Sequence, residues 1–123
     1  MSVNPTLEKA LDEYIIEGIR ERKGRGITIL DLSEIDGAAA NQFIICEGTS
    51  TMQTSAIADS VRDYLLEHAG KKPYNYDGYR NSEWIVIDYG DTLVHVFNRD
   101  TRRHYNLEEL WSDARVTELP DLD

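Results

Sequence analysis

Apolar residues recur at every third or fourth position in two stretches of the chain, and this spacing predicts two amphipathic helices. The first helix is expected over residues 7–22, with Asn4 as its N-cap and Pro5 at its first position, where a missing N–H costs nothing. The second is expected from Ser50 to about residue 68, because Ser50 and Gln53 have the spacing of a capping box.

Short apolar runs between and after these helices predict β-strands. Residues 27–32 are rich in β-branched side chains, and residues 43–48 form a nearly continuous apolar run, which is typical of a strand buried on both faces. Residues 84–89 and 92–97 predict two further strands. The two residues between them begin with Gly90, so the strands are expected to form a tight hairpin.

The remaining segments are expected to be connections, one short helix and a tail. Residues 33–42 and 74–83 are polar connections, residues 106–111 predict a short helix, and the acidic residues 115–123 are expected to fray. We therefore expect a single domain over residues 1–114 followed by the tail. The order of elements favours an α/β fold in which a mixed β-sheet is sandwiched with packed helices.

The expected hairpin sorts its side chains onto two faces, because alternate residues of a strand point to opposite sides of a sheet. The first face is a uniform core face made of Ile85, Ile87, Tyr89, Thr92, Val94 and Val96. The second face, as we call it below, carries Trp84, Val86, Asp88, Leu93, His95 and Phe97. This second face is too apolar for solvent, so a further layer of the domain, a second copy of the chain or a different partner must cover it.

Composition and charge narrow the classes of partner and compartment. The net charge of −10 argues against broad electrostatic binding to nucleic acid. It favours a protein partner that has a basic surface. Cys46 is the only cysteine, so no disulfide can form within the chain and a cytoplasmic location is expected. The sequence shows neither a membrane span nor the pattern of a secretory signal.

The hairpin also contains groups that occur in metal sites and in acid–base catalysis. Asp88, Asp91 and His95 lie within eight residues of one another. The hairpin separates them, because Asp91 falls in the turn while Asp88 and His95 are diagonal neighbours that can share a hydrogen bond. The chain has no paired-histidine spacing of a zinc site. We therefore expect no catalytic residues, no metal and no cofactor, and a structural Asp88–His95 hydrogen bond.

Two other segments carry candidate chemistry. Gly48, Thr49 and Ser50 stand between a strand and a helix, where free N–H groups can hold a phosphate. They lack the glycine-rich pattern of a nucleotide loop, and capping already explains Ser50. Residues 99–105 form a local basic patch. This patch is open to two interpretations: contact with RNA or an acidic surface, or a solvated turn whose arginines pair with neighbouring acids.

Several phrases of the sequence together resemble a known family. They are FIICEGTS from Phe43, IADSV from Ile57, EWIVIDYGDTLVHVF from Glu83, and R-x-x-Y-x-L-E-x-L-W, which comprises Arg102, Tyr105, Leu107, Glu108, Leu110 and Trp111. In their order and spacing they resemble the ribosomal silencing factors, the Iojap-like proteins of bacteria and organelles, over about residues 7–114. One departure is Asn41-Gln42, where the family commonly has Asp-Tyr before the strand.

The resemblance implies a fold similar to that of nucleotidyltransferases but without catalytic residues. It implies binding to the large ribosomal subunit at its intersubunit face, through the fourteenth large-subunit protein. Occupation of that place blocks joining of the small subunit and lowers translation under nutrient limitation. Free members of the family are often homodimers.

The family's hairpin and C-terminal motifs, together with the second face, give the residues that we expect to contact the partner. They are Trp84, Asp88, Gly90, Asp91, Leu93, His95, Phe97, Tyr105 and Trp111. Two alternatives remain open. One is a homodimeric scaffold whose hairpin face meets its own copy, and the other is a small nucleotide- or metal-dependent transferase that uses Ser50, Asp88 and Asp91.

Overall fold

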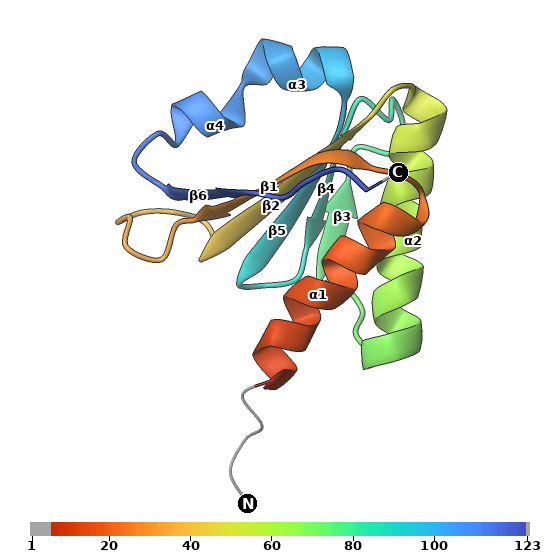
Figure 1. Ribbon diagram of the computed structural model, residues 1–123, viewed down its shortest axis with the longest axis horizontal. Helices are drawn as coiled ribbons and strands as arrows, with labels where there is room; N and C mark the ends of the chain where they lie inside the picture. Colours follow the sequence, from red (N-terminus) through yellow and green to blue (C-terminus); the bar gives the residue numbers. More distant parts are fainter. Residues whose placement is uncertain (1–5, 123) are drawn as a thin grey trace, which may run out of the picture.

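The computed structural model describes residues 6–122, which form a mixed β-sheet with helices on both faces (Figure 1). The strands are β1 (Arg25–Asp31), β2 (Gln42–Gly48), β3 (Asn75–Asp77), β4 (Trp84–Asp88), β5 (Thr92–Asn98) and β6 (Arg115–Glu118). The helices are α1 (Thr6–Glu21), α2 (Thr51–Ala69), α3 (Arg99–Tyr105) and α4 (Leu107–Leu110). The expected α/β class and layered arrangement are confirmed.

The sheet has the strand order β3-β4-β5-β2-β1-β6. Only β2 and β5 pair in parallel, and the other neighbours pair antiparallel. A parallel pair needs a long crossover, which α2 and the β3–β4 segment supply. The centre of the sheet is therefore β5-β2, and β4 lies one strand in from the β3 edge.

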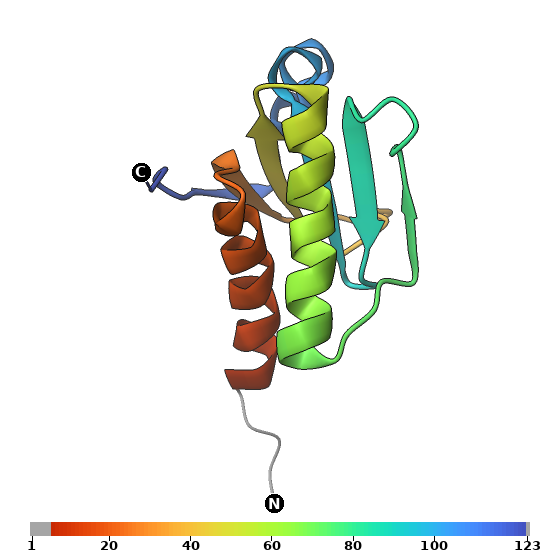
Figure 2. The same ribbon diagram turned by 90° about the vertical axis from the view of Figure 1, so that its right-hand side faces the viewer.

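Two apolar cores form, one on each face of the sheet. Helices α1 and α2 lie side by side on the first face (Figure 2), where Ile57 and Val61 of α2 pack against strand residues such as Ile85. On the other face, Leu107 and Ala114 pack against Phe97. Strand β2 contributes to both cores and is buried on both sides, as its apolar run predicted.

The ends of α2 follow the predicted capping chemistry. The Ser50 side chain accepts a hydrogen bond from the Gln53 backbone N–H at 3.0 Å. The Gln53 side chain reaches back to the backbone N–H of Thr49, one residue before the cap, at 2.7 Å. Gly70 ends the helix in the left-handed conformation with φ of 61°. The caps expected for the first helix, Asn4 and Pro5, lie outside the described residues.

Three segments differ from expectation. The tail is not frayed over residues 115–118, because β6 pairs with β1 along its length, and Leu119 packs against the first core. The connection at residues 74–83 contains β3, which pairs with β4. Residues 99–105 form helix α3 rather than a turn. Both β3 and β6 are exposed along their length. Their sequences therefore lack the sustained alternation of apolar and polar residues that predicts a half-buried strand.

Over residues 6–122 no helix has the length and apolar character needed to cross a membrane.

Candidate partner-binding face

The hairpin has the predicted register and faces. Trp84 pairs with Phe97, and Asp88 pairs with Leu93. The Tyr89 N–H donates to the Thr92 carbonyl at 2.9 Å, which closes the two-residue turn. All six residues of the first face are buried. This part of the structure follows directly from the alternation of the sequence.

The same domain covers two of the six residues of the second face. Phe97 is fully buried against Leu107 and Ala114, and His95 is 5% exposed between the rings of Phe43 and Trp84. Trp84, Val86, Asp88 and Leu93 remain partly exposed. Internal cover therefore accounts for His95 and Phe97 of β5, and it leaves Leu93 and the β4 residues of this face partly open.

Six aromatic rings form a connected cluster on this face. They are Phe43, Trp84, His95, Phe97, Tyr105 and Trp111. The Trp84 ring lies between Phe97 and Tyr105, with centroids 4.9 and 4.8 Å away. The Trp111 ring meets Phe43 edge-on at 5.8 Å, and Phe43 pairs with Leu93 across the sheet. Hairpin and C-terminal motifs are thus brought together in space.

His95 is held in one neutral form within this cluster. The Trp84 Nε1–H donates to His95 Nδ1 at 3.1 Å, so the ring proton resides on Nε2. Nε2 is buried and has no hydrogen-bond partner among residues 6–122. Burial lowers the pKa of His95 to about 4, because the charged imidazolium would lose its hydration.

The expected Asp88–His95 hydrogen bond is wrong. His95 accepts from Trp84, and Asp88 Oδ1 accepts from the Gly90 N–H at 2.7 Å. A carboxylate two residues before a turn N–H closes a local ring, and this short contact outcompetes a diagonal one across strands. Asp88 therefore fixes the hairpin turn.

The residues that remain accessible form a stripe along β4. We define the hairpin stripe as Trp84, Val86, Asp88, Gly90, Asp91, Leu93 and Tyr105. It runs roughly 20 Å from Trp84 to Gly90 at the usual rise per strand residue. Tyr105 is 52% exposed and lies against Trp84 at one end, and Asp91 is exposed at the other. Trp111, which is partly exposed, borders the stripe near Leu93.

Two of the expected contact residues do not reach this surface. Phe97 is fully buried under Leu107 and the Trp84 ring, and His95 is nearly so beside the rings of Phe43 and Trp84. In this structure neither side chain is accessible for a direct contact, and both support Trp84 from beneath.

A hollow of about 280 Å³ lies at the Tyr105 end of the stripe. Trp84 and Tyr105 contribute its aromatic wall, and the acidic side chains of Asp77 and Glu83 lie on its rim with Arg80. Such a rim offers both ring faces and carboxylates to a partner side chain.

The other candidate chemistry has structural explanations. Ser50 is engaged as a helix cap, and within residues 6–122 no group of three His, Cys, Asp or Glu side chains is placed to hold a metal ion. In the basic patch, Arg99 and Arg102 pair with the acids Glu47 and Glu108, as the second interpretation proposed, although on a helix.

Two contributors were missed from the sequence. Phe43 was assigned only to a strand, yet it joins Trp111 to His95. Arg102 stood in the C-terminal motif without a role, yet it is 9% exposed and fully bonded. The motif spacing that contained Arg102 and Glu108 was the available signal for this pair.

Comparison with known proteins gives consistent matches across most of the chain. Residues 6–123 match the family model described as "Ribosomal silencing factor during starvation". A relative named ribosomal silencing factor RsfS, from Bacillus subtilis, is 37% identical over 112 residues, covering 91% of this chain and 93% of the relative. The chloroplastic protein Iojap of Zea mays is 40% identical over 78 residues, which cover 63% of this chain and 33% of that protein.

A crystal structure of a protein from Chromobacterium violaceum is similar in fold. It has a TM-score of 0.78 and 33% sequence identity, over 85% of each chain.

Proposed function

Because the chain belongs to the ribosomal silencing factor family, we propose that it binds the large ribosomal subunit and prevents the small subunit from joining. The contact is a protein on the intersubunit face, the fourteenth large-subunit protein, and the result is lower translation when nutrients are limiting. The protein acts in the cytoplasm by occupying a surface, without cofactor, metal or catalysis. Its likeness to nucleotidyltransferases remains a prediction.

The hairpin stripe is the observation that carries this proposal. Trp84 and Tyr105 present large rings at the surface, and Trp84 packs directly on the buried core residue Phe97. Exposed aromatic residues backed by a rigid interior are typical centres of protein interfaces, because they bury much area at little entropic cost. The proposed contact residues are Trp84, Asp88, Gly90, Asp91, Leu93, Tyr105 and Trp111.

Charge supports a protein contact over an RNA contact. With a net charge of −10, the chain is repelled by ribosomal RNA phosphates and attracted to basic protein surfaces. Asp88, Asp91 and the acids around the hollow place negative charge along the stripe itself.

Sedimentation through a sucrose gradient tests the proposal. The protein is expected to co-migrate with isolated large subunits and to reduce the yield of joined ribosomes when small subunits are added. Absence from the large-subunit fractions would refute it. Specific binding of a nucleotide with Mg²⁺ in calorimetry would favour the transferase alternative instead.

Truncation of Trp84 to alanine is expected to weaken large-subunit binding by about 2 kcal/mol, roughly thirtyfold, if Trp84 is a central contact. Tyr105→Ala is a companion variant, since Tyr105 is half-exposed. The control is Leu66→Ala, which trims an exposed side chain of α2 behind the opposite face of the sheet.

Thermal unfolding identifies any loss that comes from misfolding of the variants. Unchanged affinity for both Trp84→Ala and Tyr105→Ala would remove the stripe from the interface. Light scattering at several concentrations shows whether the same variants alter self-association, which would favour the homodimeric scaffold.

A further inference from the structure

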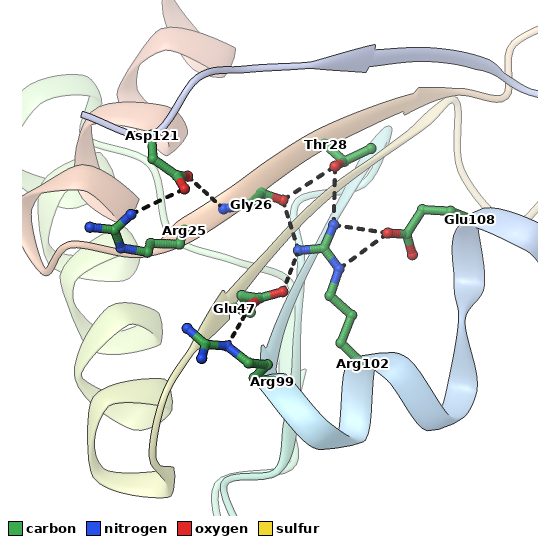
Figure 3. Close-up of polar contacts among 8 residues, drawn as sticks. All are labelled: Arg25, Gly26, Thr28, Glu47, Arg99, Arg102, Glu108 and Asp121. Carbon is green, nitrogen blue, oxygen red and sulfur yellow. Dashed lines mark hydrogen bonds and ion pairs between the residues drawn. The ribbon is translucent and has the colours of Figure 1, made fainter. Parts of the chain in front are cut away.

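The Arg102 guanidinium uses all of its N–H groups within the domain (Figure 3). Only 9% of the residue is exposed, and each donor has an oxygen partner. Nη1 donates to the Gly26 carbonyl at 2.7 Å and to Glu47 at 3.0 Å. Nη2 donates to Thr28 Oγ1 at 3.0 Å and to Glu108 at 2.9 Å, and Nε donates to the same Glu108 oxygen at 3.1 Å. Five directed bonds fix the side chain in one geometry.

These bonds tie the two short helices to the sheet. Arg102 belongs to α3, Gly26 and Thr28 to β1, Glu47 to β2, and Glu108 to α4. Helices of seven and four residues are too short to be stable alone, so their placement depends on such tertiary contacts. Arg99 also pairs with Glu47 at 3.1 Å. At this junction of α3 and α4 with the sheet, the charges of two arginines therefore neutralise those of two glutamates.

The β1 backbone at Gly26 leaves the space that the Arg102 guanidinium occupies. Gly26 has φ of 62°, at a register shift between β1 and β2, and a Cβ at this position would lie 2.6 Å from Arg102 Nη1. Glycine alone combines this conformation with the space that the guanidinium needs. This observation is independent of the hydrogen bonds and indicates that the backbone conformation is specific for an arginine at position 102.

The two helices carry aromatic residues of the partner-binding region. Tyr105 is the last residue of α3 and borders Trp84, and Trp111 directly follows α4. We propose that Arg102 is a positioning residue for partner binding: it fixes α3 and α4 so that Tyr105 and Trp111 are held ready for the partner. It does so from beneath, without touching the partner. This inference rests on the proposed function, and its effect is preorganisation of the contact surface.

The test compares Arg102→Met with Arg103→Met in the full chain. Arg103 is the next residue of α3 and is exposed, so the control removes the same charge without removing the bonds. Arg102→Met is expected to weaken binding to large subunits by about tenfold or more, and Arg103→Met to change it by less than about twofold.

Two further measurements separate positioning from general destabilisation. Amide hydrogen exchange of the free protein should speed up over residues 99–114 in Arg102→Met and stay unchanged in β4 and β5. In a double-mutant cycle, Arg102→Met should add little to the combined variant Tyr105→Ala/Trp111→Ala, because the residues that it positions are already gone.

The outcomes distinguish the two proposals. If wild-type protein does not bind large subunits, the proposed function fails, and hydrogen exchange still tests the placement of α3 and α4. If wild-type protein binds and Arg102→Met binds equally well, the positioning role is overturned. The positioning role would also be overturned if, in the double-mutant cycle, the fold losses in affinity of Arg102→Met and of Tyr105→Ala/Trp111→Ala simply multiplied. If Arg102→Met does not fold, Glu108→Gln replaces it, since this change weakens the junction and keeps an oxygen acceptor.

Discussion

At the scale of single residues, Trp84 connects the interior to the proposed contact surface. One edge of its indole donates to His95, one face stacks on the buried Phe97, and the remainder is open beside Tyr105. A ring held in this way loses little side-chain entropy when a partner covers it. The buried histidine beneath it is therefore part of the surface's rigidity, although it is not itself accessible.

His95 makes stability dependent on pH. Burial lowers its pKa to about 4 from the ordinary 6.5, so between these values the unfolded chain binds a proton that the folded chain does not. The free energy of unfolding is thus complete above pH 6.5 and falls as the pH drops toward 4, by roughly 3 kcal/mol in all.

Replacement of His95 by glutamine tests this dependence. Glutamine keeps an acceptor for Trp84 and removes the titration, so the variant should lose roughly 2 kcal/mol less than wild type between pH 7 and pH 4.5 in denaturant unfolding. The matched control is His68→Gln, which makes the same exchange at an exposed position of α2. Parallel pH profiles for wild type and His95→Gln would contradict the assignment.

At the scale of elements, local chemistry predicted α2 and the hairpin well. Ser50 and Gly70 mark the ends of the helix, and alternation fixed the hairpin register. Helix α3 was missed because its stability comes from Arg102 and its distant partners, which local periodicity does not contain. Strand β6 was missed because pairing with β1, and not burial, orders it.

Removal of the α2 cap should destabilise the fold measurably. Ser50→Ala leaves the Gln53 N–H without its acceptor and is expected to cost about 1 kcal/mol in the free energy of unfolding. Ser55→Ala, in the interior of the same helix, is the matched control and should be near neutral, because its hydroxyl donates to the Met52 carbonyl of its own helix and does not cap the helix end. Equal unfolding midpoints for the two variants would contradict the role of Ser50.

At the scale of the whole molecule, the C-terminal segment closes the sheet. Beyond β6, Leu119 packs on the first core, and Asp121 accepts from the Gly26 N–H at 2.9 Å and pairs with Arg25. The chain beyond β6 therefore lies next to the β1 residue Gly26, whose carbonyl accepts from Arg102, and it is part of the domain.

Truncation after Ala114 tests this closure. Loss of the β1–β6 pairing, of Leu119 and of Asp121 is expected to lower the free energy of unfolding by about 2 kcal/mol or more, and Tm by roughly 5–10 °C. A chain that ends at Asp121 keeps these contacts and should unfold as the full chain does. A Tm that is unchanged after the longer truncation would restore the expectation of a frayed tail.

The sequence by itself determined the elements whose signals are local: two long helices with their stop signals, the double-sided burial of β2, and the two faces of the hairpin. It also contained the family motifs. Only the tertiary structure decided which residues of the second face are open. That choice depends on where α3 and α4 lie, and Arg102 ties these helices to Gly26, Thr28 and Glu47 of the sheet, which are 55 to 76 positions away in the sequence. Hydrogen bonds of this length in sequence leave no periodic pattern, so spacing alone cannot show them.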